Sequence, residues 1–164
     1  MILHHLWAFV FLSAFISCRE PDIGLTQSDR KMISDSIRQT LNNYFADIKK
    51  EGLTAEFKYL DSSSDFFWVP PRYKSSISYD SIAAILKTYA PFYQSTDNSW
   101  ETLMINPLSH NLASYSGRIQ SITTDSSGKV SKFTLIETGL VIKRETGWKL
   151  LNGQTSVIES QQDD

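Results

Sequence analysis

One acidic side chain stands within an otherwise apolar stretch, namely Glu137 in the segment LIETG. If Glu137 points into a closed interior, the loss of water raises its pKa and suits it to act as a general base or as a contact for a ligand. Alternatively, an irregular strand at Gly139 turns Glu137 outward as an ordinary charge at the sheet edge. We favour the outward orientation, because carboxylates with structural roles are commoner than catalytic ones.

The other residue types that carry chemistry are sparse. His110 is the one histidine outside the first five residues, and Cys18 is the single cysteine. These two residues cannot supply the Cys and His ligands of a zinc site, and a nucleophilic serine would lack the G-x-S-x-G turn. The glycines are too scattered to form a phosphate-binding loop or a dinucleotide fingerprint. The sequence therefore predicts no metal site, no cofactor and no catalytic residue set.

Aromatic side chains are numerous, and several of them follow one another in the segment DFFWVPP. Strand alternation predicts that Phe67 points one way while Phe66 and Trp68 point the other. If Trp68 faces a cavity, an apolar ligand with a few polar groups is the natural guest. A collapsed interior filled by these rings is the alternative, since burying large rings is a common way to stabilise a small domain.

The bulk composition narrows the class of protein and of partner. The chain has 164 residues, which fits one domain. Its 16 Lys and Arg against 18 Asp and Glu give a formal net charge of -2, with both signs interspersed. Because no basic patch stands out, nucleic acid is not expected as a partner.

The elements that position these residues begin with helices. Thr26 or Ser28 can cap an amphipathic helix that ends at Gly52, and the segment 53–60 is typical of a short second helix. Ser78 or Asp80 can cap a third helix, which a proline at position 91 ends or kinks.

Strands follow the helices. An aromatic strand precedes Pro70, and from Ser99 onward the hydrophobic period is that of strands separated by polar turns. The phase of the apolar residues changes near Gly139, which predicts a bulge and a sharply curved sheet. The expected fold class is α+β, a cone-like fold with three N-terminal helices packed on a strongly curved antiparallel sheet.

The segment GLVIKRETGWKLLNG forms the last predicted hairpin. Trp148 and Leu150 are expected to anchor the final strand to the core. If the alternation continues, Asn152 and Gln154 lie on the same face and reach the interior. The hairpin is thus interpreted as scaffold whose far end lines a pocket.

The order of these elements and four local stretches resemble the nuclear transport factor 2-like superfamily, in its SnoaL-like branch. The stretches are NNYFADIKKEGL, SDFFWVPP, YDSIAAILKTYAPFY and IKRETGWKLL, and the resemblance covers residues 26–157. It implies a cone whose interior is the working part. The superfamily includes isomerases, cyclases, dehydratases, epoxide hydrolases and binding modules, so the fold alone does not settle the function.

The resemblance also assigns individual positions. Tyr44 matches a tyrosine that the ketosteroid isomerase branch uses in its oxyanion hole, but the position of that branch's base falls at about Trp68, which cannot take a proton. Asn152 and Gln154 stand where many SnoaL-like relatives carry histidines on the last strand. Amides orient a ligand and do not titrate near neutral pH. The expected interior is therefore short of groups that transfer protons.

The first residues, MILHHLWAFVFLSAFISC, resemble a bacterial lipoprotein signal. We expect a signal peptide at 1–17, lipidation of Cys18, a tether at 18–25, one domain at 26–158 and a disordered tail at 159–164. An ordinary signal cleaved nearby, with a spare thiol at Cys18, is the alternative. The protein is expected to be exported and to meet the membrane of the cell envelope through the lipid anchor alone.

The predicted function is non-catalytic binding of a small apolar or amphipathic molecule, or of an envelope protein, by this cone. The residues expected to bind the ligand are Tyr44, Trp68, Tyr115, Glu137, Asn152 and Gln154. The alternative is an isomerase or hydratase-like enzyme that uses Tyr44 as hydrogen-bond donor and Glu137 as base. A third interpretation is a module that only binds other envelope proteins. The resemblance also implies a homodimer formed through the outer face of the sheet.

Overall fold

The computed structural model of the chain describes residues 24–162, with side chains described up to residue 159. The predicted signal peptide at 1–17 and the predicted lipidation site Cys18 lie outside the described residues. Within the described residues, no helix is both long enough and apolar enough to cross a membrane.

The first helix, α1 (Gln27–Glu51), begins and ends at the residues that the sequence predicts. The hydroxyl of Thr26 accepts a hydrogen bond from the backbone N–H of Asp29, whose carboxylate accepts one from the N–H of Thr26, which completes a capping box. Gly52 ends the helix at φ 87°, a left-handed conformation that favours glycine. The buried face of α1 includes Ile37, Leu41 and Tyr44.

Three shorter helical elements precede the meander. The element η1 (Leu53–Lys58) is a 3-10 helix where the sequence predicts a short helix. The helix α2 (Tyr79–Tyr89) begins after Ser78, whose hydroxyl accepts a hydrogen bond from the N–H of Ser81. It ends just before Pro91, where the 3-10 turn η2 (Ala90–Phe92) leads into the sheet.

Five strands form one sheet in the order β1-β5-β4-β3-β2. The strands β2 (Tyr93–Pro107), β3 (Leu112–Asp125), β4 (Val130–Arg144) and β5 (Gly147–Gln162) make an antiparallel meander. The short strand β1 (Phe67–Val69) joins the edge of β5 in parallel. The predicted α+β class with helices on a curved sheet is confirmed.

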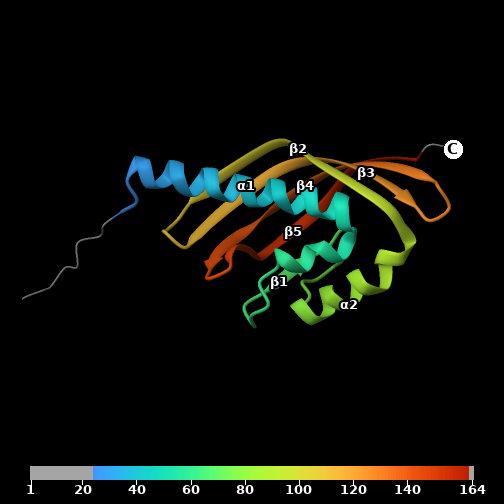
Figure 1. Ribbon diagram of the computed structural model, residues 1–164, viewed down its shortest axis with the longest axis horizontal. Coiled ribbons are helices and arrows are strands. Elements are labelled where there is room, and N and C mark those ends of the chain that lie inside the picture. The colour runs from blue at the N-terminus through green and yellow to red at the C-terminus, as the bar shows by residue number, and fades with distance from the viewer. Residues whose placement is uncertain (1–23, 163–164) are drawn as a thin grey trace, which may run out of the picture.

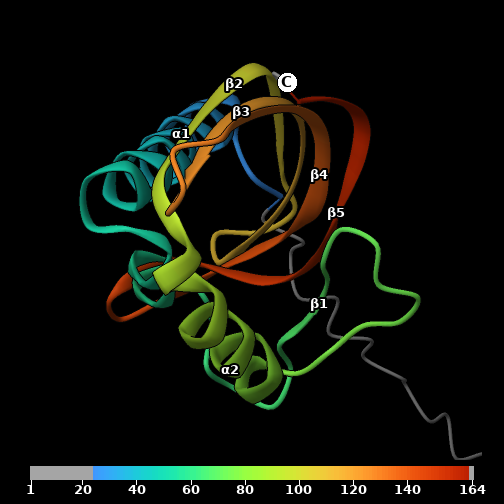
Figure 2. The same cartoon turned by 90° about the vertical axis from the view of Figure 1, so that its right-hand side faces the viewer.

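The sheet curls around the helices and leaves a concave face toward them. Figure 1 shows α1 lying along the sheet, and Figure 2 shows the strands curving around the view axis, with α1 on one side and α2 below. The buried core joins α1 to the inner sides of the strands, through residues such as Ile37, Leu41, Ala113, Ile119 and Val141. The concave face therefore forms one wall of the protein interior.

The bulges lie elsewhere than the sequence predicts. Gly139 pairs regularly with Tyr115 on β3 and Gly153 on β5. The register shifts between β4 and β5 instead leave Leu151 and Ile158 as extra residues on β5, and Gln94 and Glu101 are the extra residues on β2. The predicted bulge at Gly139 is wrong, since the curvature of the sheet comes with irregularities of β2 and β5.

The closing hairpin anchors the core as the sequence predicts. Trp148 and Leu150 on β5 are both buried. The bulge at Leu151 then reverses the alternation, so Gly153 and Thr155 face inward while Asn152 and Gln154 do not. The prediction that all four even-numbered residues share one face is therefore wrong beyond Leu150.

The last strand is longer than expected. β5 continues through Gln162, paired with Ser131 of β4. From the sequence, a disordered tail is expected at 159–164, whereas the strand includes residues 159–162. The pairing with β4 supplies backbone hydrogen bonds that residue type alone does not reveal.

Candidate ligand cavity

A partly enclosed cavity of about 220 Å³ lies between the concave face of the sheet and the helices. Its apolar wall includes Phe45 of α1, Leu86 of α2, Ile119 of β3 and Leu135 of β4. Phe66 and Trp68, which precede and form β1, add a pair of stacked rings with centroids 6.5 Å apart. The interior is thus not fully closed by its aromatic side chains.

The orientation predicted for the aromatic strand is confirmed. Phe66 and Trp68 are buried on the cavity side, whereas Phe67 is 46% exposed. Two adjacent glycines make room for the Trp68 ring, because Trp68 pairs with Gly153 and Gly153 pairs with Gly139. A Cβ built on Gly153 would lie 2.7 Å from the Trp68 ring carbon Cη2. The two glycines therefore allow the Trp68 ring to lie close to the backbone of β4 and β5.

Replacing Gly153 by Ala should push the Trp68 ring off the sheet and destabilise the protein. The added methyl group would also meet the carbonyl oxygen of Thr138, which cannot move without disturbing the strand. We expect a loss of roughly 1 to 3 kcal/mol in the free energy of unfolding, as for overpacked cores. Urea unfolding measures this loss, and Gly24→Ala, at an exposed position before α1 with open space around it, is a control for loss of a glycine without a contact. An unchanged free energy for Gly153→Ala would contradict the packing described here.

Glu137 lies at the centre of the polar part of the cavity. Its side chain points inward, and the residue is 6% exposed, so the outward orientation favoured from the sequence is wrong. The hydroxyl of Tyr115 donates to Oε1 at 2.8 Å, and the hydroxyl of Thr155 donates to Oε2 at 3.0 Å. Burial raises the pKa of Glu137 despite these two hydrogen bonds, which act to lower it.

The indole of Trp68 belongs to the same hydrogen-bonded chain. Its Nε1–H donates to the hydroxyl of Thr155 at 3.0 Å, and Thr155 in turn donates to Glu137. These hydrogen bonds therefore connect four strands, through the side chains of Tyr115, Glu137, Thr155 and Trp68. Such a network fixes the carboxylate relative to the cavity.

A second carboxyl group, Glu56 of η1, lines the same cavity. Burial raises the pKa of Glu56 from 4.5 to about 8, a hydrogen bond with Tyr44 acts to lower it, and the charge of Glu137 raises it further. Glu56 is consequently protonated at neutral pH. Burial and the two carboxylates also raise the pKa of Tyr44 well above its usual value, so Tyr44 stays a hydrogen-bond donor.

Glu56 carries no local signal of a functional role. It lies in the segment LTAEFK, where an acidic residue in a short helix usually faces water. Only the packing of η1 against α1 and α2 brings Glu56 to the cavity. The expectation of an interior short of proton-carrying groups is wrong, since two carboxyl groups and a tyrosine share one cavity wall.

Asn98 and Thr155 complete the polar part of the wall. Oδ1 of Asn98 on β2 is buried and has no hydrogen-bond partner among the described residues. No Lys, Arg or His is found among the described residues that line the cavity. The wall thus combines apolar surface with carboxyl, amide and hydroxyl oxygens and holds no cation.

The six predicted ligand-binding residues divide into three groups. Tyr44, Trp68 and Glu137 line the cavity. Tyr115 is buried behind the wall and contacts Glu137. Asn152 and Gln154 are not part of the cavity wall, because the bulge at Leu151 turns them away from it.

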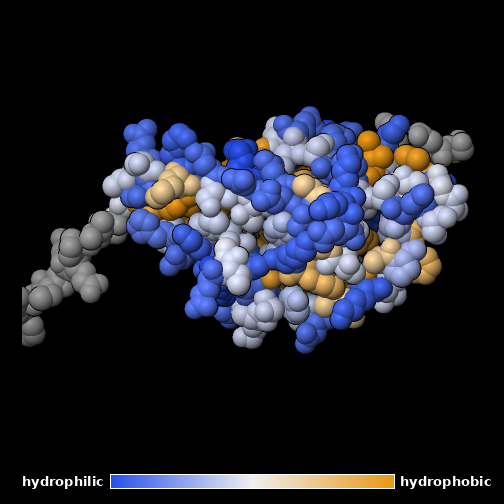
Figure 3. Space-filling view, in the orientation of Figure 1, coloured by the Kyte–Doolittle hydropathy of each residue, from blue (hydrophilic) through white to orange (hydrophobic). Residues whose placement is uncertain are grey.

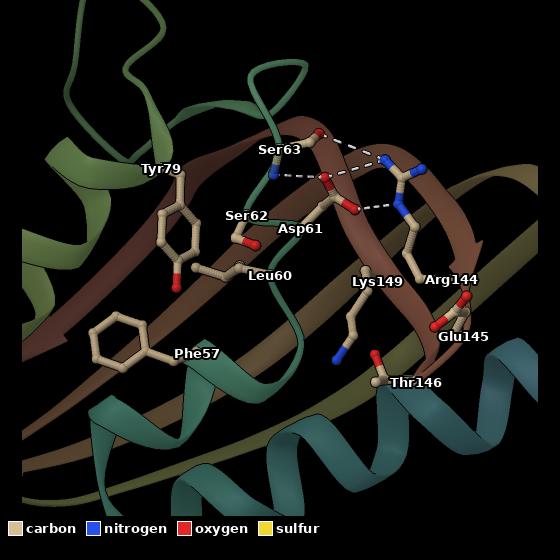
Figure 4. Close-up of a pocket in the computed structure, with 10 residues that line it drawn as sticks. All are labelled: Phe57, Leu60, Asp61, Ser62, Ser63, Tyr79, Arg144, Glu145, Thr146 and Lys149. Atoms are coloured by element: carbon tan, nitrogen blue, oxygen red, sulfur yellow. Dashed lines mark hydrogen bonds and ion pairs between the residues drawn. The ribbon is translucent and has the colours of Figure 1, made fainter.

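A larger hollow of about 480 Å³ opens to solvent next to the cavity, and Leu60 belongs to both walls. Figure 4 shows Asp61 and Arg144 facing each other there, beside Ser63. The Arg144 guanidinium donates to both oxygens of Asp61, at 2.6 and 3.2 Å. Burial acts to raise the pKa of Asp61, but hydrogen bonds from Arg144 and Ser63 outweigh it, so the pKa is lowered. Asp61 and Arg144 of this open cleft are thus already paired with each other, and the more enclosed inner cavity is the better site for a ligand.

The described residues offer no cluster of three or more His, Cys, Asp or Glu side chains that could hold a metal ion. The face of the molecule drawn in Figure 3 is largely hydrophilic, with smaller hydrophobic areas between the hydrophilic ones.

Solved structures of other proteins share this architecture at low sequence identity. A candidate scytalone dehydratase from Novosphingobium aromaticivorans aligns with a TM-score of 0.72 and 10% identity, over 85% of this chain and 93% of that chain. The hexachlorocyclohexane dehydrochlorinase LinA-type3 from Novosphingobium barchaimii aligns with a TM-score of 0.67 and 11% identity, over 84% of this chain and 94% of that chain.

A third similar structure carries the name of the superfamily itself. It is a nuclear transport factor 2-like superfamily protein from Salmonella enterica serovar Typhimurium, with a TM-score of 0.63 and 18% identity, over 81% of this chain and 93% of that chain. The chain has the nuclear transport factor 2-like fold. No protein-family model matches the sequence, and no curated protein matches it. The nuclear transport factor 2-like fold therefore accounts for the cone, while the function has to be argued from the cavity.

Proposed function

We propose that this domain binds a small, largely apolar molecule inside the cone, without transforming it. The observation that carries the proposal is the partly enclosed cavity of about 220 Å³, whose apolar wall is interrupted by Tyr44, Glu56 and Glu137. Small-molecule sites commonly combine an apolar wall with a few convergent polar groups. The volume lies below the roughly 300 Å³ at which sites for drug-sized ligands begin, so the guest is a compact molecule.

Proton transfer is the second candidate function, and the two carboxyl groups favour it. An acid and a base are found where neighbouring environments push the pKa values of two groups apart. Here burial raises the pKa of both carboxyl groups, but two hydrogen bonds act to lower the pKa of Glu137, whereas the charge of Glu137 raises the pKa of Glu56 further. An isomerase or hydratase-like reaction would use Glu137 as base, Glu56 as acid and Tyr44 as hydrogen-bond donor.

One experiment separates binding from catalysis. Small compounds are titrated into the protein while the NMR signal of the Trp68 Nε1–H, which lies at the cavity wall, is followed. Compounds that shift this signal are then incubated with the protein in D2O, and their deuterium content is measured by mass spectrometry.

Non-catalytic binding predicts a shift without deuterium uptake at carbon. Uptake that Glu137→Gln abolishes, and that the control Glu145→Gln at an exposed hairpin position retains, would establish proton transfer instead. A Trp68 signal that no compound shifts would contradict both functions.

We further propose that the domain is held on a membrane of the cell envelope through lipid at Cys18. Replacing Cys18 by Ser should move the protein from the membrane fraction to the soluble fraction of cells that process lipoproteins, because a single site of attachment is lost. Cell fractionation with immunodetection measures the distribution. Unchanged membrane association of Cys18→Ser would contradict the anchor.

A homodimer remains a prediction. Met104, Ile122 and Ile136 are exposed and lie on β2, β3 and β4, on the side of the sheet away from the cavity. Burying them against a second copy or against an envelope protein is the proposed use of that face. Sedimentation analysis of the purified protein measures its oligomeric state.

A further inference from the structure

We infer that the guest of this cavity is a small organic cation, namely a protonated amine attached to a compact apolar body. The inference rests on the proposed binding function and names the chemical class of the ligand.

The first argument is the unused hydrogen-bonding capacity of the cavity wall. Each oxygen of Glu137 accepts one hydrogen bond, from Tyr115 or from Thr155. An ionised carboxylate offers about four lone-pair sites, so Glu137 can still accept from a guest. An ammonium group supplies three N–H donors and no acceptor, which complements this wall.

The second argument is charge. A buried carboxylate is normally paired with a cation, yet no basic side chain is among the described residues of the wall. Basic residues on neighbouring elements are engaged elsewhere, Arg144 with Asp61, Lys58 with Asp47 and Glu51, and Lys49 with Asp97. We therefore expect the ligand to supply the positive charge that balances the carboxylate of Glu137.

The third argument is the apolar and aromatic remainder of the wall. Tyr44, Phe66 and Trp68 line the cavity, and aromatic faces attract cations, most strongly where water is excluded. Leu86, Ile119 and Leu135 leave apolar surface for the body of the guest. A carboxylate or phosphate guest would instead meet two carboxyl groups and no cation.

The test compares matched probes on the intact protein. A series of primary amines from butylamine to benzylamine is titrated beside the alcohols of the same carbon skeletons, with the Trp68 Nε1–H signal as the readout. Because a charged hydrogen bond in a desolvated site is worth about 1.5 to 3 kcal/mol, the best amine should bind at least about tenfold more tightly than its alcohol.

Two further measurements identify the carboxyl groups as the cause. Glu137→Gln should reduce the advantage of the amine over the alcohol to less than about threefold, whereas Glu145→Gln should leave it intact. In the unmodified protein, saturation with the amine should lower the pKa of Glu56 by about one unit or more, and saturation with the alcohol should not. The groups that face Glu56 and titrate with it are Tyr44 of α1 and Glu137 of β4.

Each outcome decides the inference. Tighter binding of amines that depends on Glu137 supports it. If alcohols bind as well as amines, or if the advantage of the amine survives Glu137→Gln, the inference of a cationic guest is wrong. The proposed binding function would still stand. If no probe of either series shifts the Trp68 signal, both the inference of a cationic guest and the proposed binding function are contradicted.

Discussion

Replacing Glu56 by Gln should raise the free energy of unfolding at pH 8 by roughly 4 kcal/mol, and at pH 5 by less than about 1 kcal/mol. The pKa of Glu56 is raised from 4.5 to about 8 in the folded protein, chiefly by burial. Between these two values the unfolded chain releases the proton that the folded protein keeps. Stability therefore falls as the pH rises through this window, by up to about 1.4 kcal/mol per pH unit.

Glutamine resembles the protonated carboxyl group but cannot ionise, so Glu56→Gln removes this loss of stability. Urea unfolding of the variant and of the unmodified protein at pH 5 and pH 8 measures the effect. Glu51→Gln, at the exposed end of α1, is the matched control and should show no comparable dependence on pH. An equal change at both pH values would mean that Glu56 is solvated.

Replacing Trp148 by Ala should lower the free energy of unfolding by roughly 3 to 5 kcal/mol, the usual range for a large aromatic side chain in a core. Trp148 is 5% exposed and belongs to the buried cluster that joins β5 to α1. Its loss would leave a cavity at the end of the closing hairpin. Denaturant unfolding gives the value.

The exposed residue across the hairpin supplies the control for Trp148. Lys143 pairs with Trp148 but lies in water, so Lys143→Ala should change the free energy of unfolding by less than about 0.5 kcal/mol. A near-neutral Trp148→Ala would show that the hairpin is not an anchor of the core.

The order of the elements could be predicted because local signals mark it. Thr26, Gly52 and Ser78 cap helices at the residues where the structure has their ends. The aromatic strand and the meander follow from alternation and polar turns. These signals act within a few residues, so one sequence suffices to interpret them.

The details of the cavity could not be predicted because they depend on packing between distant segments. A glycine within a strand marks either a bulge or a close approach, and Gly139 proved to be the second because Trp68, far away in the sequence, lies over it. The extra residue is Leu151, an ordinary leucine without a local signal. It moves Asn152 and Gln154 away from the interior and brings Thr155 to Glu137.

That Glu56 and Glu137 line one cavity could not be predicted, for the same reason. Glu137 was recognised as unusual, but its direction depends on the register of β4 with both neighbouring strands. Glu56 comes to the cavity only because η1 packs against α1 and α2. A sequence reveals the types of these residues, whereas their shared, water-poor surroundings arise from the tertiary fold.

The central claim is that Glu56 and Glu137 share a desolvated cavity, and a titration of the Glu56 carboxyl carbon by 13C NMR tests it most directly. The structure predicts a pKa of about 8 for Glu56, and a fall in that value when Glu137→Gln removes the neighbouring charge. A pKa near 4.5 that does not respond to Glu137→Gln would contradict the claim, because Glu56 would then titrate as a solvated side chain.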